Sequence, residues 1–121
     1  MSKKVIIIGG EGNGGIIAAC IEDNRNKYND TEYEIAGFLN DYLSADDKIL
    51  GYPVMGKIAD IDKYISEGYY FMYAILIIGK GKLRESIYDK INIPKKQLAT
   101  IIHKSAFIGI GAKIEPGVLV M

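Results

Sequence analysis

Three glycines near the start of the chain have the spacing of a phosphate-binding turn. Gly10, Gly12 and Gly15 match GxGxxG directly after the β-branched run of residues 4–8 and before apolar residues at helical spacing. Glycine lets the backbone approach a phosphate, whose charge is stabilised by N–H groups at the start of a helix. Tight strand-to-helix turns also take glycine for conformational reasons alone, and that alternative stays open. The predicted ligand contacts in this loop are Gly9, Gly10, Gly12, Asn13 and Gly14.

Asn40 and Asp41 follow the second predicted strand, residues 34–39. A dinucleotide site requires an acid near this position to bind ribose hydroxyls. The chain has Asn40 where the acid is expected, and Asp41 comes one residue later. The glycine loop therefore supports a phosphate-bearing ligand better than it supports NAD.

Other residues with chemical potential have simpler interpretations. His103, the only histidine, has a side chain suited to a base near neutral pH, but the sequence suggests no acid or nucleophile beside it. Arg84, one turn into a predicted helix, is equally suited to bind phosphate and to face water. Cys20 lies among apolar helix positions and is predicted to be a small core residue.

The elements that position these residues alternate between strand and helix, which predicts a parallel sheet covered on both faces and a Rossmann-like α/β domain. Gly68 is expected to close the second helix and Pro94 to stop the third. The predicted strands are residues 4–8, 34–39, 70–78 and 98–102, with a short extended segment at 52–56. The predicted helices lie around residues 16–21, 58–65 and 83–91; the first dissolves within 24–29, and residues 42–51 form a loop.

The last twenty residues follow a period of six. Aliphatic residues occupy Ile102, Ile108, Ile114 and Val120, and small ones follow four positions after the first three, at Ala106, Ala112 and Val118. This pattern is typical of a hexapeptide β-helix, which needs several stacked repeats for stability. Only about one coil is present, so we expect a longer protein. The predicted domains are residues 1–101 and 102–121.

Composition excludes several classes of function. The chain has 15 basic and 15 acidic residues and no net charge, which argues against a nucleic-acid binder. One cysteine and the absence of a CxxC or Cys/His cluster predict neither a disulfide nor a metal site. Residues 5–8 are too short for a signal peptide, and no apolar run approaches a membrane span. We therefore expect a soluble cytoplasmic protein without a membrane partner.

Four stretches in order make the chain resemble the amino-terminal half of the NeuD/PglD-type sugar acyltransferases. They are residues 5–14 (VIIIGGEGNG), 37–41 (GFLND), 49–56 (ILGYPVMG), and 78–79 with Arg84 followed by 101–106 (IIHKSA). The resemblance implies a Rossmann-like domain that holds a nucleotide sugar, followed here by the truncated start of a left-handed hexapeptide β-helix. In the complete protein that β-helix would trimerise and bind acetyl-CoA between subunits, with the catalytic histidine beyond Met121.

The resemblance also implies roles for residues. Gly9, Gly12 and Gly14 would approach the phosphates, and Asn40 and Asp41 would contact the nucleoside. Gly79 and Lys80 replace part of the family's Gly-Asp/Asn-Asn loop, where a lysine can still reach a phosphate or a sugar carboxylate. Asn13 stands where the family usually has histidine, and Glu11 where it has glycine or serine.

The predicted function is therefore nucleotide-sugar binding, preferably of a UDP-sugar, within an acetyl-CoA-dependent sugar N- or O-acetyltransferase of bacterial surface glycan or glycoprotein sugar synthesis. We expect the chain alone to be inactive, to bind no acetyl-CoA and to form no trimer. The alternatives are a non-catalytic NAD- or nucleotide-binding Rossmann module, and a β-helix scaffold whose Rossmann part only packs.

Overall fold

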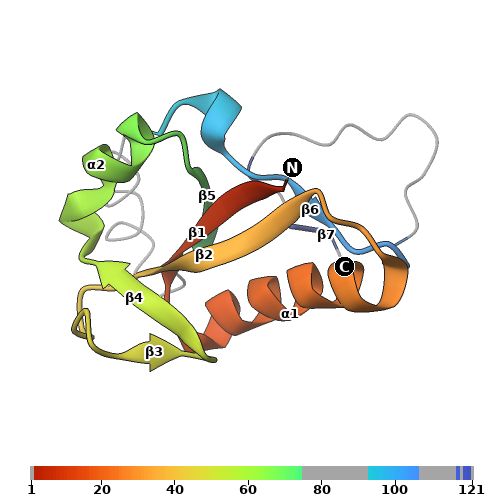
Figure 1. The fold of residues 1–121 in the computed structure, drawn as a ribbon, viewed down its shortest axis with the longest axis horizontal. Helices are drawn as coiled ribbons and strands as arrows, with labels where there is room; N and C mark the ends of the chain where they lie inside the picture. Colours follow the sequence, from red (N-terminus) through yellow and green to blue (C-terminus); the bar gives the residue numbers. More distant parts are fainter. Residues whose placement is uncertain (1, 75–92, 107–116, 118, 121) are drawn as a thin grey trace, which may run out of the picture.

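The computed structural model describes residues 2–74, 93–106, 117 and 119–120, and its centre is a five-stranded sheet in the order β3-β4-β2-β1-β5 (Figure 1). Four of these strands pair in parallel, and β3 pairs antiparallel with β4. The predicted Rossmann-like α/β fold is confirmed. The strands are β1 (Lys3–Gly9), β2 (Tyr33–Leu39), β3 (Lys48–Ile49), β4 (Tyr52–Gly56) and β5 (Tyr70–Ala74).

The side chains of β1 alternate between two apolar layers, because successive residues of a strand point to opposite faces. Val5 and Ile7 belong to the cluster that packs against α1 (Glu11–Tyr28). Ile6 and Ile8 belong to the cluster that includes residues of α2 (Ile61–Ser66). All four side chains are fully buried. Figure 1 shows the two helices on opposite sides of the sheet, so the continuous apolar run marks a strand covered on both faces.

Helix α1 is longer than the sequence predicts. It does not dissolve at Asn24, but continues to Tyr28 and ends at Asn29, whose left-handed backbone (φ 55°) directs its N–H to the carbonyl of Asn24. The correction has a physical cause, since the Asn24 side chain is buried against a distant part of the chain, residues 102–104. Asn24 interrupts the apolar pattern of the helix because its side chain makes a tertiary contact.

The second predicted helix is confirmed, in two parts. A 3-10 turn, η1 (Ile58–Asp60), leads into α2. Asp60 accepts a hydrogen bond from the Lys57 backbone N–H at 2.9 Å, which supports the first turn. Gly68 follows the helix, and its N–H bonds to the carbonyl of Ile65 at 3.1 Å, as expected for a glycine that ends a helix.

The predicted loop at residues 42–51 contains a strand that the sequence analysis missed. β3 and β4 form a hairpin with a two-residue loop, in which Ile49 lies opposite Tyr52. Leu50 and Gly51 both have positive φ, 52° and 84°, as a type I′ turn requires. Ile49 is buried, which explains why this short strand forms. The sequence analysis did not recognise the turn because Leu50 occupies its first position, where asparagine is the usual indication of a type I′ turn.

The last predicted strand, residues 98–102, is shorter in the structure, and its two ends pair with different strands. Leu98 follows the 3-10 turn η2 (Lys95–Gln97) and makes one parallel bridge to Phe71 of β5. β6 (Ile101–Ile102) instead pairs in parallel with β7 (Leu119–Val120). Ile102 pairs with Val120, three repeats of six further along the chain, as stacked coils of a hexapeptide solenoid require.

Several predictions lie outside the described residues. These are the end of the strand predicted over 70–78, the helix around 83–91, and most repeat positions between 107 and 118. Within the described part of the chain, no helix is both long and apolar enough to cross a bilayer. The same residues contain no cluster of three or more His, Cys, Asp or Glu side chains arranged to hold a metal ion.

Candidate functional site

The glycine loop lies at the carboxyl end of β1, where the start of α1 faces solvent. β1 ends at Gly9, and Gly10 is the N-cap of α1 in an extended conformation, with no side chain to bond the first-turn N–H groups. The first four N–H groups of a helix lack partners within the helix, and the helix dipole favours an anion beside them. This end of an 18-residue helix can therefore bind a phosphate.

The neighbours of each glycine show which ones the fold itself requires. Gly9 has φ +142°, and a Cβ there would lie 2.8 Å from the carbonyl oxygen of Ala74 on β5. At Gly14 a Cβ would lie 2.8 Å from a ring carbon of Phe38. Both glycines are explained by packing, so their predicted contacts with phosphate stay predictions. Gly14 in particular is buried between α1 and the sheet.

Gly12 is different. It is exposed in the first turn of α1, and a Cβ there would meet nothing within 4 Å. Its φ is not positive, so neither packing nor backbone strain accounts for glycine at this position. Gly10 and Asn13 flank it at the N-cap and in the first turn, both partly buried. Gly12 is thus the position where the missing side chain leaves open space beside the helix N-terminus.

Asn40 and Asp41 hold the neighbouring loop in place. Asn40 donates from Nδ2 to the Gly9 carbonyl at 3.0 Å, and its Oδ1 accepts from the backbone N–H groups of Tyr42 and Leu43. Asp41 Oδ1 accepts from the Ile58 N–H at 2.9 Å. These bonds tie the end of β2 to the glycine loop and to η1. The predicted nucleoside contacts are therefore also loop-ordering residues, which the sequence did not reveal.

The sheet order places this loop at a topological switch point. β1 lies between β2 on one side and β5 on the other, and the chain passes to β2 first and to β5 later. In open α/β sheets, ligands bind outside the carboxyl ends of strands at such a point. Three predicted site residues, Gly79, Lys80 and Arg84, lie beyond β5 and outside the described residues.

A family comparison supports the relationship suggested by the four sequence stretches. A family model described as the PglD N-terminal domain matches residues 4–91 of the chain. The chain belongs to the PglD N-terminal domain family. The resemblance to NeuD/PglD-type sugar acyltransferases is thus confirmed, and the matched residues contain both the glycine loop and the Asn40–Asp41 turn.

Solved structures of acetyltransferases share the fold of this family member. The acetyltransferase domain of PglB from Neisseria gonorrhoeae FA1090, in complex with acetyl coenzyme A, has a TM-score of 0.72 at 24% identity, over 100% of this chain and 54% of that one. A mutant of perosamine N-acetyltransferase from Caulobacter crescentus, in complex with CoA and GDP-perosamine, has a TM-score of 0.69 at 26% sequence identity. The match covers 98% of this chain and 51% of that one. The chain thus spans about half the length of these structures. No curated protein matches the sequence significantly.

A groove runs along the solvent side of α1 from the glycine loop. It begins at Glu11 and Gly12 and is bordered by Ile16, which is 45% exposed, and by Leu50 of the β3–β4 turn, which is 51% exposed. Near its far end the Tyr52 hydroxyl donates to Glu22 at 2.5 Å. Burial, followed by the hydrogen bond to Glu22, raises the pKa of Tyr52 to about 12. Tyr52 therefore stays protonated as a donor at neutral pH.

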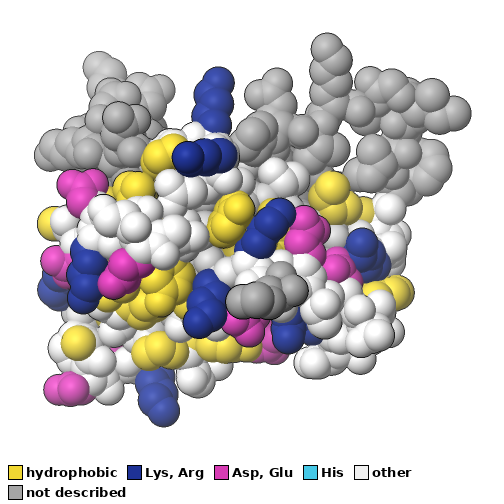
Figure 2. Space-filling view, turned by 45° about the horizontal axis from the view of Figure 1, so that its top comes forward, with side chains coloured by type: hydrophobic (Ala, Val, Ile, Leu, Met, Phe, Trp, Pro, Cys, Tyr) yellow, Lys and Arg dark blue, Asp and Glu magenta, His cyan; other side chains and the backbone are white. Residues whose placement is uncertain are grey.

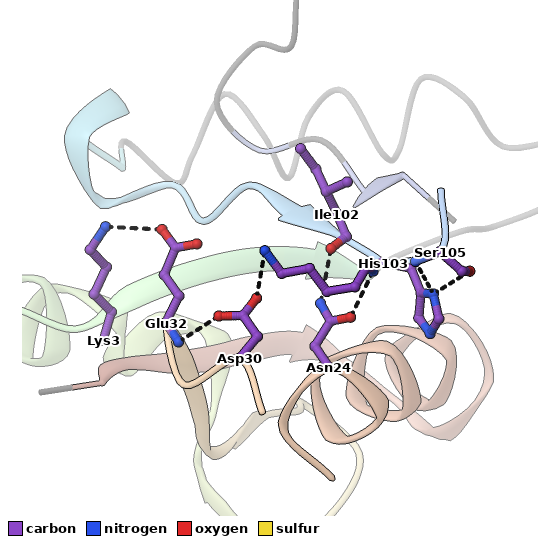
Figure 3. Close-up of polar contacts among 8 residues, drawn as sticks. Lys3, Asn24, Asp30, Glu32, Ile102, His103 and Ser105 are labelled. Atoms are coloured by element: carbon purple, nitrogen blue, oxygen red, sulfur yellow. Dashed lines mark hydrogen bonds and ion pairs between the residues drawn. The ribbon is translucent and has the colours of Figure 1, made fainter. Parts of the chain in front are cut away.

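A second group of polar side chains lies at the other end of α1, next to β6 (Figure 3). Figure 3 shows His103 beside Ser105, with Nδ1 2.7 Å from the Ser105 hydroxyl. On the other side of the ring, Nε2 lies 3.4 Å from Asp23 Oδ2. The sequence suggested no acid or nucleophile beside His103, and that expectation is wrong. Asp23 comes from a helix about eighty residues earlier in the chain, so no local motif could indicate it.

The polar groups around His103 are already engaged. A cavity of about 210 Å³ lies here between α1, β2 and β6, bordered by Asp30, Glu32 and Lys104 among others. Lys104 pairs with Asp30 at 3.3 Å, and Glu32 pairs with Lys3 at 3.5 Å. Among the described residues, no buried side-chain nitrogen or oxygen lacks a partner. This cluster therefore has the character of a structural contact, whereas the glycine loop has that of a ligand site.

Charge is mixed over the visible surface. Figure 2 shows Lys and Arg side chains interspersed with Asp and Glu over the face in view, without a large area of one sign. This distribution agrees with the balanced composition of the sequence. Attraction of a phosphate ligand must then come from the local field of the α1 N-terminus and from nearby donors.

Proposed function

We propose that this chain is the nucleotide-sugar-binding domain of an acetyl-CoA-dependent sugar N- or O-acetyltransferase that acts in bacterial surface glycan or glycoprotein sugar synthesis. The observation that carries the proposal is the open start of α1 at Gly12 in a member of the PglD N-terminal domain family. The diphosphate of the ligand binds at this helix N-terminus. Asn40 and Asp41 bind the nucleoside, and we expect Gly79, Lys80 and Arg84, which lie outside the described residues, to contact the ligand as well.

The contacts of Asn40 favour a nucleotide sugar over NAD. The nitrogen and the oxygen of its side-chain amide both form hydrogen bonds with backbone groups. Asn40 also stands where NAD would need a carboxylate to bind the adenosine ribose. Asp41 lies one residue later, and its Oδ1 bonds to Ile58. Backbone groups and amides can pair with the edge of a pyrimidine base without that acid. We therefore favour a UDP-sugar, although the solved perosamine enzyme contains a GDP-sugar.

For the whole protein we propose that the acetyl group passes from CoA to an amine or hydroxyl of the bound sugar. The solved relatives, one with acetyl-CoA and one with CoA and a nucleotide sugar, support this chemistry. The acyl-transfer residues then belong to further hexapeptide coils, and the complete enzyme is a cytoplasmic homotrimer. The 121-residue chain by itself should not turn over acetyl-CoA, bind it or form that trimer. Thioester cleavage by the purified chain would contradict this part of the proposal.

Calorimetric titration tests the ligand. We expect UDP and a UDP-amino sugar to bind the chain with a Kd in the micromolar to millimolar range, and NAD and NADH to bind more weakly or not at all. Inorganic phosphate at the same ionic strength is the control for simple anion binding. Tight binding of NAD without binding of either UDP or GDP ligands would reject the acetyltransferase interpretation in favour of a dinucleotide-binding module.

A further inference from the structure

We propose that the repeat segment leaves the Rossmann-like domain through a rigid joint, in which Asn24 of α1 is the positioning residue for residues 102–104. By the α1–β6 joint we mean the contacts of Asp23, Asn24, Tyr28 and Asp30 with the segment 102–105. The proposal concerns how the two parts are held together and is independent of the ligand.

Asn24 is one of two buried polar residues among those that the structure describes, at 7% exposure. Its Nδ2 donates to the Ile102 carbonyl at 2.9 Å, and its Oδ1 accepts from the Lys104 backbone N–H, also at 2.9 Å (Figure 3). A buried amide is costly to leave unpaired, and both ends of this one bond the same segment. Two bonds at alternate residues fix both the position and the direction of that segment on α1.

The contacts around Asn24 brace the same segment on either side. The Ser105 backbone N–H lies 3.2 Å from His103 Nδ1, and His103 Nε2 lies 3.4 Å from Asp23 Oδ2. The ring of Tyr28 meets His103 edge-on at 5.6 Å between centroids. These exposed and half-buried contacts are individually weak, but all of them oppose rotation of the segment about the two Asn24 bonds.

The chain that enters the joint is part of the domain core and does not behave as a linker. Ala99 is completely buried and Ile101 is 2% exposed, and both belong to the cluster under α1. The Ala99 N–H bonds to the Phe71 carbonyl of β5, and the Gly117 N–H bonds to the Ala99 carbonyl. The predicted boundary between residues 101 and 102 separates the strand–helix pattern from the period-six pattern of the sequence. In the structure, however, the residues just before this boundary pack in the domain core.

The joint has a consequence for the distance between two functional parts. Gly12 and Asn24 lie on the same helix, and twelve residues of helix span about 18 Å. α1 is thus a fixed spacer between the open helix start and the first strand of the repeat segment. A ligand bound at Gly12 and a coil that continues from β7 keep a constant separation as long as the Asn24 contacts persist.

The test is amide exchange and backbone relaxation by NMR on the 121-residue chain, comparing wild type with Asn24→Ala, Asn24→Asp and Asn26→Ala. Asn26 is exposed on the same helix, so its variant is the matched control. In wild type and control we expect order parameters near 0.85 for residues 101–104, as for rigid backbone. In Asn24→Ala the Lys104 amide should exchange at least ~10-fold faster, with amides of β1 and β2 unchanged; tenfold corresponds to ~1.4 kcal/mol.

Asn24→Asp separates a positioning role from general destabilisation. The carboxylate can still accept from the Lys104 N–H but cannot donate to the Ile102 carbonyl. We expect the Lys104 amide to remain protected while the carbonyl carbon shift of Ile102 moves. A wild-type Lys104 amide that exchanges like a free peptide would overturn the proposal. So would equal acceleration of all amides in Asn24→Ala, or no difference between Asn24→Ala and Asn26→Ala.

Discussion

The two ends of α1 are built in opposite ways. At its start, Gly10 supplies no side-chain cap, and a Cβ at Gly12 would meet nothing within 4 Å among the described residues. Near its end, Asn24 is buried, and its amide bonds to Ile102 at the end of β6 and to Lys104 two residues later. The first end has no side-chain cap, and the second pairs its polar groups within the protein.

This difference separates a ligand site from a structural contact. The cluster of His103, Asp23 and Ser105 contains residue types that catalyse reactions in other proteins, yet its neighbours are already paired. The glycine loop contains no catalytic side chain, but it offers N–H groups that have no partner within the helix, and the positive end of a helix dipole. The open helix start is therefore the reason why we propose the glycine loop, and not the His103 cluster, as the ligand site.

The largest effect we expect comes from a pair of glycines at the start of α1. Gly14→Val should lower the free energy of unfolding by about 3 kcal/mol, because the new side chain overlaps the buried Phe38 ring. Gly12→Ala, two residues away, should leave stability unchanged or raise it by up to ~1 kcal/mol, since alanine favours helix and meets no neighbour. Urea unfolding of both variants measures the difference. Equal destabilisation would show that Gly12 is also required by the fold.

The sequence was sufficient to predict this end of the helix. A β-branched run, a glycine-rich turn and apolar residues at helical spacing are local signals, and together they located β1, the loop and α1. They could not distinguish Gly14 from Gly12, because that distinction depends on Phe38 of the neighbouring strand. Packing partners from other strands are not encoded in the spacing of a motif.

Binding gives the next largest effect. Gly12→Val places a branched side chain between the ligand and the backbone N–H groups, so we expect the Kd of UDP to rise at least ~10-fold, or ~1.4 kcal/mol. Asn24→Ala is the control from the other end of α1 and should bind UDP as wild type does. Calorimetry measures both, after thermal melts confirm that each variant is folded. If Gly12→Val is folded and binds UDP normally, the loop is only a turn.

The other end of the helix could not be predicted from sequence. β6 pairs with β7 at a separation of 18 residues, three times the period of six in the sequence, and the domain boundary at residue 102 stays a prediction. The period-six pattern did not indicate that Asn24 would bond to the end of β6, because Asn24 and Ile102 are far apart in the chain. The end of the helix was predicted too early for the same reason. Asn24 bonds to Ile102 and Lys104, and Arg25 bonds to Ser2 and Tyr33, so these two polar side chains have partners far away in the chain.

The smallest effect concerns the middle of α1, where the Tyr52–Glu22 hydrogen bond joins the helix to β4. Tyr52→Phe removes a donor to a carboxylate and should cost about 1 kcal/mol of stability at pH 7, measured by urea unfolding. Tyr42→Phe is the matched control, because Tyr42 is 94% exposed and its replacement should leave stability unchanged. A loss in Tyr52→Phe no larger than in the control would show that the bond contributes nothing.

The pH dependence sharpens this last prediction. The pKa of Tyr52 is about 12 in the folded protein, above its ordinary value of 10.0, so the folded state retains the proton that the unfolded state releases first. The contribution of Tyr52 is therefore fully present below pH 10 and is lost as the pH rises toward 12. Other tyrosines and lysines titrate over the same range, so the quantity to measure is the difference between wild type and Tyr52→Phe. We expect this difference to be constant from pH 7 to 9 and to shrink above pH 10. A difference that stays constant to pH 12 would mean that Glu22 does not hold the phenol proton.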